Sequence, residues 1–113
     1  MRRILPIAAI LLASPLAASR PMTIDDIFKV ARVAAPAVSV TGDIAYQVGM
    51  VDLAANKVHT RIWLKGAAAT EAKALDLGKG NQSSPRFSPD GKSLSYEQGG
   101  QLWIVELATM KTR

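Results

Sequence analysis

Polar and apolar residues alternate over three short stretches in the second half of the chain, as they do in strands that are half buried in a sheet. These stretches predict strands over residues 84–88, 93–97 and 101–107. Between the first two, Pro89 fixes the backbone for the first turn position, and Gly91 accepts the positive φ that a tight reversal needs. The pattern therefore predicts two consecutive antiparallel hairpins.

The preceding part of the chain carries the same kind of pattern over longer stretches. A short entry strand is expected at residues 37–39, followed by a long hairpin over residues 44–51 and 58–64. Residues 71–77 would add a fourth, outer strand, and residues 78–83 would connect the first unit to the second. In the second unit we expect no fourth strand, so the chain is predicted to stop within that unit.

The two units align as an internal repeat. Residues 39–46 align on residues 88–96 if one residue is dropped after Asp43, and residues 61–64 align on residues 101–104. The offset is 49 positions at the start of the unit and 40 at its tryptophan, close to the ~40–50 residues of a β-propeller blade. A chance likeness of two ordinary hairpins is the alternative interpretation.

Two such units define the expected fold. The sequence predicts an all-β protein, a partial β-propeller of about two four-stranded antiparallel blades over residues 37–113. A propeller closes a ring of ~4–8 blades, because each blade buries its faces against its neighbours. We therefore expect the amino-terminal piece of a longer protein, with the Trp103 face of the second blade left open. If the shortened turn at Gly42 has lost the geometry of the turn at Gly91, Gly42→Ala should cost less stability than Gly91→Ala.

A short helix and a linker are expected over residues 20–36. Thr23 is a suitable N-cap, acidic residues follow it, and basic residues precede Val33. Apolar residues recur at helical spacing at Ile24, Ile27, Phe28 and Ala31. Pro36 is expected to stop this helix before the first strand.

Residues 1–19 have the pattern of a secretory signal peptide. Arg2 and Arg3 precede an apolar run over residues 4–13, and small residues at 17–19 suit a signal peptidase. The run is shorter than the ~20 residues of a membrane-spanning helix, so no stable membrane span is expected, although an uncleaved anchor is the alternative. The sequence predicts a secreted or periplasmic protein.

Composition excludes some functions. The formal net charge of +5 includes the two arginines of the predicted signal peptide, and the other basic residues are scattered among acidic ones. Without a basic stripe, nucleic-acid binding is not expected. The chain has no cysteine and therefore no disulfide and no thiolate metal site.

No catalytic, cofactor-binding or metal-binding residue is predicted. His59 is the only histidine, so the chain cannot build a histidine pair for a metal. Asp25 and Asp26 suit the start of a helix, and Asp90 suits closure of its own turn. Ser93 follows a turn and lacks the Gly-x-Ser-x-Gly motif of a hydrolase nucleophile.

The helix and the two units described above resemble the corresponding parts of the secreted prolyl-oligopeptidase-like serine peptidases, in the dipeptidyl-aminopeptidase and acylaminoacyl-peptidase branch. Residues 23–27, with the following Val33 and Pro36, are similar to the mature amino terminus of that family. Residues 83–92 and the Leu-Trp pair at 102–103 are similar to its next blade. Blades with Ser-Pro-Asp-Gly turns also occur in periplasmic TolB-like propellers, which bind partner proteins without catalysis and are the alternative family.

The resemblance implies a propeller that covers an α/β-hydrolase domain and filters peptides on their way to a Ser-Asp-His triad. That triad is absent from this chain, so whether the chain belongs to an enzyme is left open at this stage. The implied partners are a peptide substrate, reached through the missing hydrolase domain, or a partner protein in the alternative family. No cofactor is implied.

Overall fold

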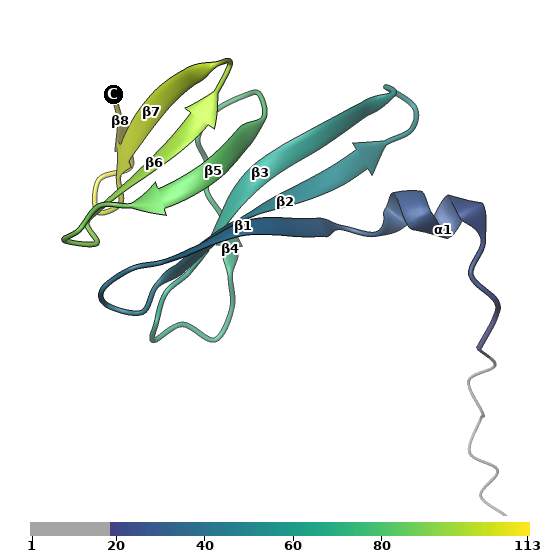
Figure 1. The fold of residues 1–113 in the computed structure, drawn as a ribbon, viewed down its shortest axis with the longest axis horizontal. Coiled ribbons are helices and arrows are strands. Elements are labelled where there is room, and N and C mark those ends of the chain that lie inside the picture. The colour runs from purple at the N-terminus through teal and green to yellow at the C-terminus, as the bar shows by residue number, and fades with distance from the viewer. Residues whose placement is uncertain (1–18) are drawn as a thin grey trace, which may run out of the picture.

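The structure, a computed structural model, describes residues 19–113. These residues form two antiparallel sheets preceded by one short helix (Figure 1). The all-β prediction is confirmed. The predicted signal peptide lies outside the described residues except for Ser19.

The two sheets follow one another along the chain, each with four strands in sequential order. The helix is α1 (Ile24–Lys29), and the first sheet contains β1 (Arg32–Val38), β2 (Ile44–Asp52), β3 (Lys57–Lys65) and β4 (Lys73–Ala74). The second sheet contains β5 (Gln82–Phe87), β6 (Ser93–Gln98), β7 (Gln101–Glu106) and β8 (Lys111–Thr112). The prediction of about two antiparallel blades is confirmed.

Helix α1 is shorter than the sequence predicted. The prediction that it extends to Val33 is wrong, because the helix ends at Lys29 and none of its residues is buried. A six-residue helix with so little burial gains little from packing. Val33 instead pairs with Val48 of β2, so β1 begins before Pro36 and the predicted division between linker and blade falls inside a strand.

Pro36 belongs to the repeat and does not mark the end of the helix. It lies at a bulge in β1, and Pro85 lies at a bulge in the matching position of β5. Each proline follows a residue with positive φ, Ala35 at 50° and Ser84 at 54°. The two units are therefore alike in a feature that the alignment of their sequences does not include.

The fourth strands differ from the prediction. Lys111 pairs with Glu106, so the second sheet has a short fourth strand, and the prediction that it has none is wrong. In the first sheet, only residues 73–74 of the predicted 71–77 pair with β3. Leu75 and Leu77 are nevertheless buried, because they pack into the core beside the paired residues.

The core lies between the two sheets, which pack face to face. Its buried members from the first sheet and its connection are Ala45, Ile62, Leu75 and Leu77, and those from the second are Leu94, Tyr96 and Val105. Strand β5 lies against β1, β2 and β3, which places the second sheet across the first (Figure 1). Each sheet therefore covers one face of the other.

The two Tyr-Trp pairs of the repeat have the same strand register, but one lies in the core and the other at the surface. Tyr46 lies opposite Trp63, and Tyr96 lies opposite Trp103. Tyr96 is 1% exposed and Trp103 packs on the core, whereas the pair in the first sheet lines the surface turned away from the second sheet. The prediction that the Trp103 face is open is wrong, and the open face is that of Trp63.

The first hairpin is longer than the second. Beyond the Tyr-Trp pair, β2 and β3 continue for six residue pairs, whereas β6 and β7 continue for two. The extension projects toward α1 (Figure 1). It accounts for the smaller repeat offset at the tryptophans than at the start of the unit.

The two tight turns of the repeat share one geometry. Gly42 donates its N–H to the carbonyl of Ser39 (N to O, 3.1 Å), and Gly91 donates likewise to Ser88 (2.9 Å). The values of φ are 88° at Gly42 and 72° at Gly91. The shortened first turn has therefore kept this geometry. Asp90 closes the second turn, as predicted, by accepting the N–H of Lys92 (3.0 Å).

We expect Gly91→Ala and Gly42→Ala each to lower the free energy of unfolding by about 1–2 kcal/mol, because an L side chain is strained at these dihedrals. A Cβ added at Gly91 would meet only ordinary contacts, the nearest at 3.6 Å, so the cost is that of the backbone. Urea denaturation measures it. The matched control is Gly49→Ala in β2, where φ is not positive and the nearest atom to a new Cβ lies 3.7 Å away. Equal stabilities of all three variants would contradict the turn geometry.

Within residues 19–113, no helix has the length and the apolar character that crossing a bilayer requires.

Candidate functional site

The titratable residues singled out in the sequence do not come together as a catalytic group. His59 lies on β3, with its Nε2 atom 3.7 Å from Oδ2 of Asp52, and both side chains are well exposed. Ser93 lies on β6, in the other sheet. Within the described range, no three His, Cys, Asp or Glu side chains gather closely enough to hold a metal ion.

The adjacent acids of α1 serve the start of the helix. Both oxygens of the Asp26 carboxylate accept hydrogen bonds from the Arg20 guanidinium (2.7 Å each). The Thr23 N–H and hydroxyl donate to the same group (2.9 Å each). The hydrogen bonds from Arg20, and secondarily those from Thr23, hold the pKa of the Asp26 carboxyl well below its usual range. This group therefore stays ionised and stabilises the start of the helix.

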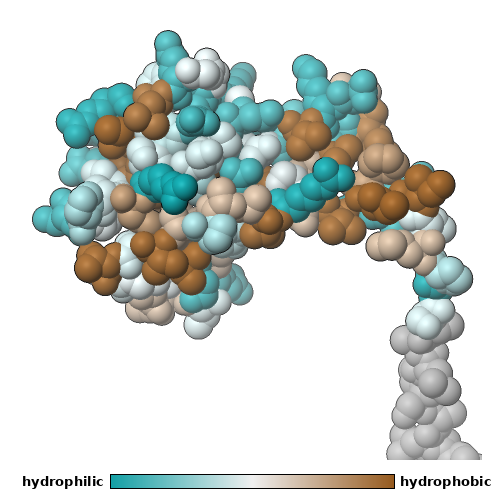
Figure 2. Space-filling view, viewed as in Figure 1, coloured by the Kyte–Doolittle hydropathy of each residue, from teal (hydrophilic) through white to brown (hydrophobic). Residues whose placement is uncertain are grey.

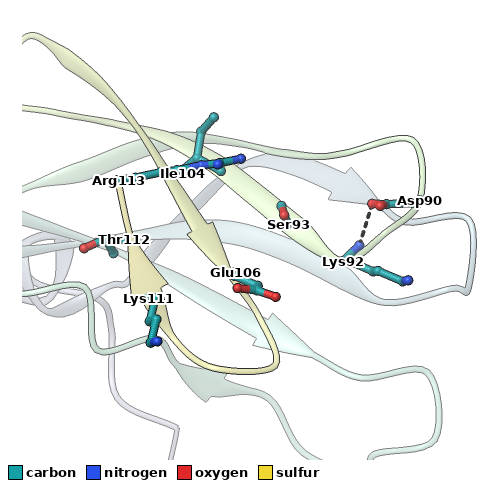
Figure 3. A pocket seen from close by; sticks show the side chains of 8 residues that line it. All are labelled: Asp90, Lys92, Ser93, Ile104, Glu106, Lys111, Thr112 and Arg113. Carbon is teal, nitrogen blue, oxygen red and sulfur yellow. Dashed lines mark hydrogen bonds between the residues drawn. The ribbon is translucent and has the colours of Figure 1, made fainter.

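A surface pocket beside β7 and β8 gathers several charged side chains (Figure 3). Its lining is Asp90, Lys92, Ser93, Ile104, Glu106, Lys111, Thr112 and Arg113. The Ser88 hydroxyl and the Lys92 N–H both donate to Asp90 and lower the pKa of its carboxyl. Glu106 accepts the Thr109 hydroxyl (3.1 Å). Both carboxylates thus accept hydrogen bonds within turns, and no histidine lines the pocket beside Ser93.

Polar side chains join the two sheets at their seam. The Ser84 N–H, at the bulge of β5, donates to Oε1 of Gln47 on β2 (3.0 Å). The Asn81 amide accepts the Thr60 N–H (3.1 Å) and donates to the Val58 carbonyl (2.9 Å). Asn81 thereby satisfies two backbone groups on a part of the β3 edge that β4 does not reach. An edge covered in this way is less open to pairing with strands of other molecules.

The surface best suited to an interaction is the apolar side of the first sheet, which we call the first outer face. It is lined mainly by Val33, Tyr46, Val48, Met50 and Trp63, and also by His59 and Arg61, which lie opposite Met50 and Val48 in the strand register. Val33 is 65% exposed and Met50 is 48% exposed. Figure 2 shows apolar side chains at the surface around α1 and the long hairpin, the part of the molecule that carries Met50. A groove of this composition favours a packed apolar partner over a polar ligand.

The second sheet also has a side turned away from the core, which we call the second outer face. The alternation of its strands places Ser95, Glu97, Leu102, Ile104 and Glu106 there, opposite in parity to the buried Leu94, Tyr96 and Val105. Leu102 is 69% exposed. The described residues thus leave one uncovered face on each sheet.

Neither outer face was predicted from the sequence. Alternation shows which residues share a face, but it does not show which face a neighbour covers. The two Tyr-Trp pairs look alike in the sequence. One lies in the core and the other at the surface, because the second sheet covers the side of the first sheet that faces away from Tyr46 and Trp63. In the sequence, only the order of the two blades distinguishes the two pairs.

Comparisons with known proteins identify solved structures with a similar fold. No protein-family model matches the sequence, and no curated protein matches it. Among solved structures, acylaminoacyl peptidase from Pyrococcus horikoshii is similar, with a TM-score of 0.67 and 25% identity over 77% of this chain. The β-propeller domain of the trilobed protease from Pyrococcus furiosus, which has an open velcro topology, is similar over 75% of this chain, with a TM-score of 0.62 and 22% identity.

The likeness covers most of this chain and a small part of its neighbours. The chain spans 14% of the acylaminoacyl peptidase and 27% of the chain of the trilobed-protease propeller domain. The two stacked sheets are therefore part of a β-propeller fold, as the repeat predicted. The structural neighbours are an acylaminoacyl peptidase and the propeller domain of a protease, and the likeness singles out no branch of a peptidase family.

Proposed function

We propose that the chain supplies the amino-terminal blades of the propeller domain in an exported serine peptidase of the acylaminoacyl-peptidase branch. The observation that carries this proposal is the structural likeness to an acylaminoacyl peptidase over 77% of the chain. The sequence resemblance at residues 23–27 and at the Ser-Pro-Asp-Gly turn supports the same family. The leader pattern of residues 1–19 supports export.

In this proposal the blades have no catalytic role. Acyl transfer requires an activated serine, a base and an oxyanion hole held together, and the described residues bring no histidine to Ser93. A hydrolase domain elsewhere in the whole protein would supply the triad. The propeller would restrict the access of peptides to that triad by size.

The reading frame downstream of Arg113 tests the proposal. We expect it to encode further blades and then a hydrolase domain with a Gly-x-Ser-x-Gly motif. The whole protein should cleave acylated peptide amides, and replacement of the motif serine by alanine should abolish turnover, whereas the purified 113-residue chain alone should show none. Further blades without a hydrolase domain would contradict the proposal and favour a non-catalytic propeller that binds partner proteins. A stop codon after Arg113 would contradict it as well.

A further inference from the structure

The tight turns of the two blades lie side by side, at the end of the sheets away from α1 (Figure 1). A Cβ added at Gly91 would lie 3.6 Å from the side chains of both Ser39 and Val40, so the two turns are in contact. A cleft of about 660 Å³ opens beside this contact, within the ~300–1,000 Å³ range of small-molecule sites. Further blades would pack on the outer faces and would leave this seam between the two blades in place.

Each blade contributes one leucine and one charged side chain to this space, which we call the inter-blade cleft. Leu64 and Leu107 are half-buried and pack against the core, so they give the cleft an apolar surface. Asp43 comes from the first blade and Lys92 from the second. Within residues 19–113, neither of these charges forms an ion pair with the other or with a third residue. The cleft therefore offers one group of each sign beside an apolar surface.

Hydrogen bonds hold both sides of the inter-blade cleft in place. Oδ1 of Asp43 accepts the Ala67 N–H (2.8 Å), and Oδ2 accepts the Thr41 hydroxyl (3.1 Å). On the other blade, the Leu107 N–H donates to the Lys92 carbonyl (3.0 Å). A site whose groups are already held in position loses less entropy when a ligand binds.

We propose that the inter-blade cleft binds a small zwitterion with an apolar body, in the form of a short apolar peptide with both ends free. The ammonium group of the peptide pairs with Asp43, and its carboxylate pairs with Lys92. Glu106, which also lines the cleft, adds to the attraction for the ammonium group. The side chains of the peptide cover Leu64 and Leu107 and remove apolar surface from water. The inference does not rest on the proposed peptidase function, because all of these residues belong to the two described blades.

The test adds the dipeptide Leu-Leu to the full 113-residue chain and follows the backbone amide signals by NMR. We expect the signals of Gly66 and Gly91, which line the cleft, to shift. The signals of Gly99 and Gly100, in the turn at the other end of β6, should stay in place. Acetylation of the amino end or amidation of the carboxyl end should each weaken binding by about 2–5-fold, because each removes one exposed ion pair.

Two substitutions assign the two charges. Lys92→Gln should lose the preference for a free carboxyl end and keep the preference for a free amino end. Asp43→Asn should reduce the preference for a free amino end and keep that for a free carboxyl end, which also shows that its turn is intact. Lys57→Gln, at an exposed position in the long hairpin, is the matched control and should bind all three dipeptides as the parent chain does.

Three results would overturn the proposal: unchanged signals at Gly66 and Gly91, equal affinity of the parent chain for the three dipeptides, or an equal loss of all three in Lys92→Gln. Each of these readouts is a binding measurement. Their failure would leave the proposed peptidase function standing, and the absence of a downstream hydrolase domain would leave the binding site standing.

Discussion

Tyr96→Ala should lower the free energy of unfolding by about 3–5 kcal/mol, the usual cost of removing a fully buried aromatic side chain. Tyr96 is 1% exposed and lies in the contact between the two sheets. Burial also raises the pKa of its hydroxyl. Urea denaturation measures the loss. A variant that is already unfolded without urea would agree with a loss of this size.

Tyr46→Ala is the matched control. It removes the same atoms from the same register position, but from the first outer face. In a single chain the loss there is limited to the cross-strand contact with Trp63, about 1 kcal/mol or less. Equal losses for the two tyrosines would contradict the assignment of the covered and open faces.

Ile62→Ala should cost about 2–5 kcal/mol, because Ile62 is fully buried and its removal leaves a cavity between the sheets. Ile62→Val removes one carbon and should cost about 0.5–1.5 kcal/mol, so the two variants form a graded series. Chemical denaturation with an unchanged slope identifies a loss of native stability.

Leu102→Ala is the control for this series, since Leu102 occupies the position of Ile62 in the second sheet. Because 69% of the Leu102 surface is exposed, this substitution should change the free energy of unfolding by less than about 0.5 kcal/mol. A loss as large as that of Ile62→Ala would place Leu102 in a core and contradict the described packing.

The sequence predicted the local elements of this fold well. Strand alternation identified the hairpins, and the Pro-Asp-Gly turn formed as its residues require, because these features depend on neighbours close in the sequence. The two Tyr-Trp pairs, which the repeat aligns, lie in the same register in the structure.

The errors arose where distant residues decide the structure. The pattern of residues 23–33 favours a helix, but Val33 gains a strand partner in Val48 that only the folded sheet supplies. Pro36 looked like a helix stop because its equivalence to Pro85 depends on bulges in two separate sheets. The first outer face, the main candidate site, depends on which side of the first sheet the second one covers.

The matched bulges and turns have a consequence for how such a chain can lengthen. Because the second sheet presents outward the same kind of face that the first presents to it, a tandem duplication of one whole unit would add a blade whose faces fit both neighbours. An insertion of half a unit would instead add only two strands, too few to cover the faces of both neighbours. A gene encoding this fold can therefore gain or lose blades in steps of one repeat, while single strands are not exchangeable parts.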